Sequence, residues 1–186
     1  ANQRPRLDGR LDEEIWKQCL PASLASPDAD DADWPAAVML AYDEEFLFLA
    51  ANCRRAPGAD YPAAEPRRSR DPDLSGRDRI EWLIDVDRDY ATFYRLTVDH
   101  RGWAADSCAG VAGWNPDWYI AAADDGTHWT IEAAIPWKEL GETPPTNPTA
   151  WAVGLQRIVP GAGFQSWTQP AAPRARPEGY GLLMFR

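Results

Sequence analysis

The stretch that decides the fold is 79-RIEWLIDV-86, in which apolar and polar residues alternate. Successive side chains of a β-strand point to opposite faces, so this alternation predicts a strand with one face against a core. The apolar face consists of Ile80, Trp82, Ile84 and Val86. The opposite face carries Glu81 and Asp85, interrupted only by Leu83, and we expect it to be at least partly solvated.

Residues 92–99 repeat the pattern, with the apolar residues Tyr94, Leu96 and Val98 on one side. Arg95, Thr97 and Asp99 alternate with them. The two runs predict neighbouring antiparallel strands that share a polar face. Glu81 and Arg95 would both lie on that face.

The remaining chain adds short strand-like runs separated by turn residues. We expect these further strands at 36–42 and 46–53, which form a hairpin, and at 118–123, 129–135, 152–159 and 180–185. The one helical hint is 136–141, which proline opens and glycine closes. The pattern predicts an all-β fold, a β-sandwich of two antiparallel sheets with at most one or two short helical turns. A single domain would span 1–186, with long loops at about 54–77 and 168–179.

Composition excludes several classes of function. The chain has 186 residues and a formal net charge of -10 at pH 7, which argues against a nucleic-acid partner because phosphate binding needs a basic surface. No apolar stretch approaches the length of a membrane span, so we expect no membrane insertion. Cys19, Cys53 and Cys108 fit no metal-ligand spacing and allow at most one internal disulfide; three buried thiols are the simpler interpretation. No signal peptide is visible after Ala1.

Five segments, in chain order, carry a family resemblance: 7-LDGRLDEEIW-16, 42-YDEEFLFLA-50, 78-DRIEWLID-85, 129-WTIEAAIPW-137 and 180-YGLLMF-185. Together they resemble the family-9 carbohydrate-binding modules and their relatives. The resemblance implies a non-catalytic module that binds oligo- or polysaccharide. It also implies secretion or a periplasmic location, a glycan-degrading enzyme as partner or covalently linked catalytic domain, and in some members structural calcium. It implies no organic cofactor.

The resemblance also assigns site residues. The family carries a glutamate and an arginine on the polar side of its groove, at the positions of Glu81 and Arg95. The alternative is an ordinary surface ion pair, which contributes little. Characterised members hold a terminal sugar between two loop tryptophans, but the matching positions here fall near Ser75 and Arg174. The two loops instead carry Arg67, Arg68, Arg70, Arg77, Arg174 and Arg176. These arginines favour an anionic glycan, because guanidinium binds carboxylate and sulfate bidentately; alternatively they only solubilise the loops.

Ten tryptophans have to be divided between the core and a ligand. Six of them occupy core-like positions: Trp16, Trp82, Trp129, Trp137, Trp151 and Trp167. Trp34 precedes a proline and is expected to cap a sandwich edge. The remaining Trp103, Trp114 and Trp118 are the candidate sugar platforms, because the Asn-Pro turn between the last two places an aromatic corner near Arg95. A structural or docking domain with a degenerate sugar site would instead bury all three.

Weak metal candidates are Asp85, Asp87 and Asp89, whose alternation is typical of a calcium loop. They do not form an EF-hand, because Tyr90 stands where that loop needs glycine. Further candidates, each more typical of a turn, are Asp8, Asp12, Asp43, Asp124 and Asp125.

Catalysis has no support, since no motif selects a pair of carboxylates and no nucleophile or nucleotide fingerprint occurs. The chain is therefore expected not to be an enzyme. A haem-binding sandwich is a less favoured alternative, because its only candidate ligands are Met39, Met184, His100 and His128.

Overall fold

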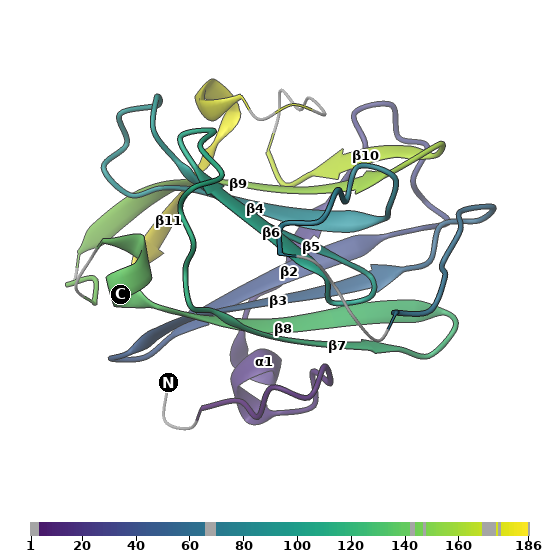
Figure 1. The fold of residues 1–186 in the computed structure, drawn as a ribbon, viewed down its shortest axis with the longest axis horizontal. Coiled ribbons are helices and arrows are strands. Elements are labelled where there is room, and N and C mark those ends of the chain that lie inside the picture. The colour runs from purple at the N-terminus through teal and green to yellow at the C-terminus, as the bar shows by residue number, and fades with distance from the viewer. Residues whose placement is uncertain are drawn as a thin grey trace.

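The computed structural model describes residues 4–65, 70–141, 144–146, 148–168, 174 and 176–185. Two antiparallel sheets face one another as two layers (Figure 1), which confirms the predicted all-β sandwich. The first sheet contains, in spatial order, β1 (Ala22–Leu24), β2 (Ala36–Tyr42), β3 (Phe46–Arg54), β8 (His128–Pro136) and β7 (Tyr119–Asp124). The second contains β10 (Gly163–Ser166), β9 (Thr149–Val159), β4 (Arg79–Asp85), β5 (Tyr94–Asp99) and β6 (Ala104–Cys108), with β11 (Gly181–Phe185) also paired to β9.

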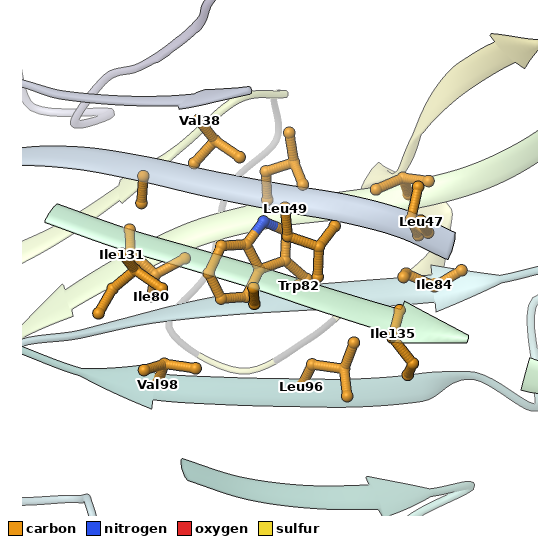
Figure 2. Close-up of a cluster of buried hydrophobic side chains, with 14 of the residues drawn as sticks. Val38, Leu47, Leu49, Ile80, Trp82, Ile84, Leu96, Val98, Ile131 and Ile135 are labelled. Carbon is orange, nitrogen blue, oxygen red and sulfur yellow. The ribbon is translucent and has the colours of Figure 1, made fainter. Parts of the chain in front are cut away.

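The main core lies between the two sheets, where Trp82 is completely buried (Figure 2). Ile80 and Ile84 flank it on β4, and Leu49 and Ile131 reach it from the opposite sheet. The apolar face predicted from residues 79–86 is therefore confirmed for these three β4 residues. The tryptophans expected to be structural, apart from Trp167, are buried, and Trp167 is half-buried against the same core.

A second cluster covers the outer face of the first sheet. The helix α1 (Glu14–Gln18) lies against this face (Figure 1) and buries Trp16 on Met39, Phe48 and Ala50. This helix is one of three short helical elements among the described residues. The other two are 3₁₀ turns at Trp137–Leu140 and Pro177–Gly179. The first is the turn predicted at 136–141, and Gly141 ends it with a φ of 70°.

Three expectations need correction. The polar face of β4 and β5 is more buried than expected: only Arg79 and Arg95 are half-buried, and the other polar side chains of this face are buried. Loop residues cover its two ends, where Asp85 accepts two backbone N–H groups and Asp99 pairs with Arg101. The strands β1, β6 and β10 were missed, since each is short and lacks clear alternation. The thiols are free, but Cys53 is the only one that is buried, while Cys19 and Cys108 are half-buried.

The positions of Trp34, of the helices and of the loop arginines also bear on the sequence predictions. Trp34 is buried, with Ala56 and Val159, and its ring contacts the Arg157 guanidinium, so it packs in a small cluster of its own. None of the helices in the described part of the chain is both long and apolar enough to span a bilayer. Arg67 and Arg68 lie outside the described residues, whereas Arg174 and Arg176 are exposed.

Candidate functional site

The outer face of the second sheet brings Glu81 and Arg95 together. In the β4 to β5 register Glu81 lies opposite Thr97, and Leu83 lies opposite Arg95. Glu81 and Arg95 are thus diagonal neighbours on one face, as the alternation predicted. On the other side of β4, Gln156 of β9 lies opposite Glu81. We call Arg79, Glu81, Arg95, Gln156 and Tyr180 the sheet-face site.

Glu81 is held firmly at the centre of this site. Its Oε1 accepts a hydrogen bond from Arg79 Nε at 3.1 Å, and its Oε2 accepts one from Gln156 Nε2 at 2.8 Å. The residue is only 5% exposed. Arg79 also donates to backbone carbonyls, including that of Ser75 at 3.1 Å. These contacts fix the planes of three polar groups before any ligand binds.

Tyr180 supplies the aromatic part of the sheet-face site. A Cβ at Gly154 would lie 2.6 Å from Cε1 of Tyr180, so the glycine lets the ring rest directly on the β9 backbone. Phe93 meets this ring edge to face, with the centroids 5.9 Å apart. Neither Gln156, Arg79 nor Tyr180 was predicted from the sequence, because their roles depend on which strands pair with β4 and on what lies over β9.

Two polar groups of this face have no partner among the described residues. One is the buried hydroxyl of Tyr180, and the other is the half-buried guanidinium of Arg95. Burial raises the pKa of Tyr180, and the nearby Arg95 charge opposes that rise. A buried donor without a partner is costly. Of these two groups, the half-buried Arg95 guanidinium is the one that a hydrogen-bonding ligand can reach.

Two of the three candidate tryptophans, Trp114 and Trp118, lie on the other side of the sheet from this face. The Trp114 ring packs on Tyr94 with centroids 4.7 Å apart, and Tyr94 points to the opposite side of β5 from Arg95. Arg101 stacks on Trp103, with its guanidinium carbon 3.9 Å from the ring centroid. Trp103, Trp114 and Trp118 are all half-buried. The predicted aromatic corner beside Arg95 therefore does not form, and the predicted site divides into two places.

Trp118 lines the second of these two places, a hollow that we call the edge pocket. This hollow of about 300 Å³ is lined by Arg70, Asp71, Ala104, Asp106, Asn115, Pro116, Trp118 and Ile120. Trp118 donates from Nε1 to Asp106 Oδ2 at 3.3 Å. Arg70 donates from Nε to Asp71 Oδ2 at 2.6 Å and from Nη2 to Asp106 Oδ1 at 3.4 Å. The pocket thus combines an indole, an amide, a guanidinium and two carboxylates.

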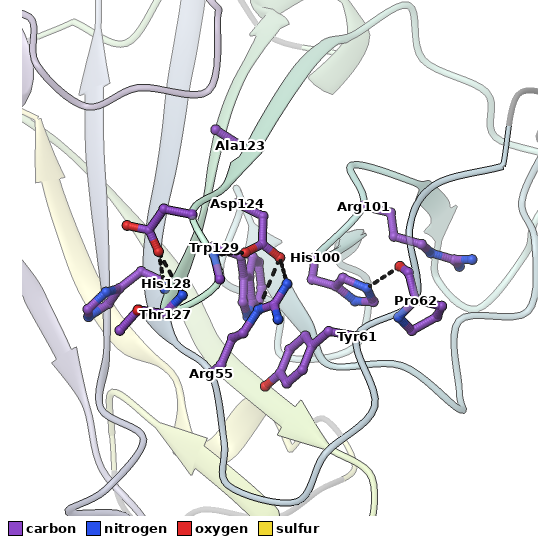
Figure 3. A network of polar contacts seen from close by, with 12 residues as sticks. Arg55, Tyr61, Pro62, His100, Arg101, Ala123, Asp124, Thr127, His128 and Trp129 are labelled. Carbon is purple, nitrogen blue, oxygen red and sulfur yellow. Dashed lines mark hydrogen bonds and ion pairs between the residues drawn. The ribbon is translucent and has the colours of Figure 1, made fainter.

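Another hollow, of about 360 Å³, is lined by loop residues that include Arg55, Tyr61, His100 and Arg101 (Figure 3). Its charged walls are paired within the protein: Arg55 Nη2 lies 2.5 Å from Asp124, and Arg101 pairs with Asp99. His100 is buried there, and its Nε2 lies 3.1 Å from the carbonyl oxygen of Pro62. This contact occupies one ring nitrogen of a candidate haem ligand. Another candidate, Met39, packs in the cluster around Trp16.

The predicted calcium residues are close together. One carboxylate oxygen from each of Asp85, Asp87 and Asp89 lies within 4.8 Å of the others. Burial raises the pKa of Asp85, and the adjacent Asp87 carboxylate adds to the rise. Hard oxygen donors and mutual repulsion fit a calcium ion. The group Asp8, Glu13 and Glu132 is also compact. Both groups already accept hydrogen bonds: Glu132 accepts three N–H donors, and Asp85 accepts two.

Comparison with known proteins identifies the fold. No family model matches the chain, and no curated protein matches it by sequence. A family-9 carbohydrate-binding module from Caldicellulosiruptor kristjanssonii, solved with cellotriose, superposes with a TM-score of 0.71 at 16% identity, covering 98% of this chain and 89% of that one. Its glucose complex gives 0.70 at 16% identity, with 99% and 92% covered. A candidate carbohydrate-binding protein from Bacteroides uniformis gives 0.66 at 11% identity, with 91% and 86% covered. The chain therefore has the fold of the family-9 carbohydrate-binding modules, as its five sequence segments predicted.

Proposed function

We propose that the protein is a non-catalytic carbohydrate-binding module whose ligand lies on the sheet-face site. The observation that carries the proposal is the convergence of Glu81, Gln156, Arg95 and Tyr180 on one face of this fold. A sugar ring packs its C–H face on an aromatic ring, and its hydroxyls pair with planar charged or amide groups. Both kinds of group are present, although the loop tryptophans typical of the family are missing.

The ligand class follows from the groups that remain unpaired. Glu81 and Gln156 are hydrogen-bonded to each other, so we expect them to orient a ligand and not to offer it an unpaired charge. Among the described residues of the sheet-face site, Arg95 is the cation without an ion pair, and a sugar hydroxyl or a uronate carboxylate could accept its hydrogen bonds. Tyr180 and Phe93 supply the apolar surface. The proposal therefore covers neutral and anionic glycans, and we expect a carboxylate to strengthen binding.

Replacing Arg95 with alanine is expected to weaken glycan binding about tenfold to one-hundredfold, because a charged hydrogen bond contributes about 1.5–3 kcal/mol. Isothermal titration with the best glycan from an array measures the loss. Arg6→Ala is the matched control, since Arg6 is an exposed arginine on the N-terminal segment. Wild-type affinity in Arg95→Ala would contradict the proposed site.

An array without any bound glycan would instead favour the alternative, a docking domain with a degenerate sugar site.

We extend the proposal to the cellular location and the partner of the protein. The protein would be exported and would direct a partner or covalently linked glycan-degrading enzyme to its polysaccharide.

A structural calcium ion is part of the proposal. Asp85, Asp87 and Asp89 would hold it after β4. Calcium at one hundred times its Kd is expected to add about 2.7 kcal/mol to the free energy of unfolding. Thermal melts with calcium and with EDTA measure this difference. Asp87→Asn should abolish it, whereas the exposed Asp28→Asn should keep it. Equal melting temperatures in wild-type protein would rule the ion out.

A further inference from the structure

The edge pocket lies on the opposite side of the second sheet from the sheet-face site. Asp106 on β6 pairs with Leu96, whose side chain points into the core, whereas Ser107 pairs with Arg95. Because side chains alternate along a strand, Asp106 and Arg95 project from opposite faces. A ligand in the edge pocket would therefore not share contacts with one at Arg95.

The edge pocket has more negative than positive charge. Among the described lining residues, Asp71 and Asp106 face a single arginine, and the short contact of Arg70 is with Asp71. The Asp106 side chain is only 8% exposed, and from the described residues its carboxylate accepts two long hydrogen bonds, of 3.3 and 3.4 Å. A buried carboxylate so weakly compensated is costly. The pKa of Asp106 is raised by burial and by the Asp71 carboxylate, so a cation placed between the two carboxylates would stabilise their charged forms.

The other walls of the edge pocket suit a sugar ring. Trp118 and Ile120 line it with apolar surface, and Asn115 adds an amide that can both donate and accept. The volume of about 300 Å³ lies at the small end of ligand pockets, so it fits one ring and not a chain. Calcium needs six to eight oxygen ligands, more than the described lining carboxylates and amide provide.

We propose that the edge pocket is a second sugar site that selects an amino sugar, with the ammonium group between Asp71 and Asp106 and the ring beside Trp118. The choice of a sugar to carry the ammonium rests on the proposed function; the preference for a cation rests on the pocket alone. The edge pocket would thereby prefer a cation, whereas the sheet-face site, through Arg95, would prefer a hydrogen-bond acceptor or an anion.

The test compares ligands that differ in one charge. Methyl glucosaminide and methyl N-acetylglucosaminide are titrated at pH 6, where the free amine is protonated, and tryptophan fluorescence and calorimetry report binding. We expect the glucosaminide to bind at least tenfold more tightly than its acetylated form. Asp106→Asn should remove that preference, whereas Asp117→Asn, which changes an exposed aspartate between Asn115 and Trp118, should keep it. Equal affinity for the two sugars would overturn the inference.

Two further variants separate the possible failures. Should Asp106→Asn fail to fold, Asp71→Asn tests the same charge, because asparagine tolerates the φ of 44° at that position. Arg6→Ala, which removes an exposed arginine outside both sites, should leave glucosaminide binding unchanged. If glucosaminide does not bind while another glycan binds through Arg95, the second site is wrong and the proposed function stands. Binding of cyclohexylamine as tight as that of the glucosaminide would contradict the sugar part.

Discussion

Replacing Arg157 with methionine is expected to lower the free energy of unfolding by about 3–5 kcal/mol, because it leaves a buried carboxylate without its partner. Arg157 and Asp78 form an ion pair whose side chains are 0% and 1% exposed. The guanidinium donates from Nε to Asp78 Oδ1 at 2.9 Å and from Nη2 to Asp78 Oδ2 at 2.6 Å. Chemical denaturation followed by tryptophan fluorescence measures the loss.

The effect is large because Arg157 and Asp78 both take part in a wider network of buried hydrogen bonds. Arg157 also donates to the carbonyl oxygens of Trp34 and Arg54, which fixes the ends of β2 and β3 beside β9. Asp78 accepts further hydrogen bonds from Trp129 Nε1 and from Tyr61 Oη. Truncating the arginine therefore leaves several buried acceptors unpaired at once.

Two controls make this prediction specific. Arg54→Met removes an exposed arginine on β3 and should change stability by less than about 0.5 kcal/mol. The double variant Arg157→Met with Asp78→Leu should cost less than the sum of its single variants, because it removes both charges. A loss below about 1 kcal/mol in Arg157→Met alone would show that the buried pair is not needed for stability.

The alternation of residues in β9 indicated a buried arginine, but alternation alone could not identify the network. The inward series Val153 and Leu155 on β9 continues to Arg157, so alternation places an arginine in the core register. What the sequence could not supply is its partner. Asp78 directly precedes β4, and the pairing of β4 with the distant β9 depends on a register that local periodicity does not encode.

The same limit explains which site residues were found. Glu81 and Arg95 lie on two strands that are consecutive in the chain, so their shared face follows from local alternation. Gln156 joins them only because β9 crosses over to pair with β4, which no local pattern indicates. The turn between Trp114 and Trp118 was recognised, but its direction relative to β5 depends on packing against Tyr94.

Glu132→Ala is expected to destabilise the N-terminal segment by about 3 kcal/mol or more, because each buried donor left without a partner costs about 1–3 kcal/mol. Glu132 is fully buried. Its Oε2 accepts hydrogen bonds from the backbone N–H groups of Asp8 and Gly9 at 2.9 and 2.8 Å, and its Oε1 accepts one from Trp16 Nε1 at 2.8 Å. Hydrogen exchange of residues 7–19 and melting curves measure the effect.

This anchor also explains the glycine in the first family-like segment. Gly9 has a φ of 83°, and a Cβ there would lie 2.5 Å from the backbone carbonyl carbon of Ala122 on β7. The segment can approach the outer face of the first sheet, and reach Glu132, only without a side chain at this position. Gly9→Ala should therefore release the same segment as Glu132→Ala does.

The control for the anchor is Glu44→Ala, which removes an exposed glutamate and should change stability by less than about 0.5 kcal/mol. Glu132→Gln should fall between the control and Glu132→Ala, because the amide keeps one acceptor but turns an N–H group toward a donor. Since the sheet-face site lies on the other sheet, glycan affinity should stay unchanged in Glu132→Ala while Trp16 becomes exposed. Loss of glycan affinity together with exposure of Trp16 would show that the two faces of the sandwich do not fold independently.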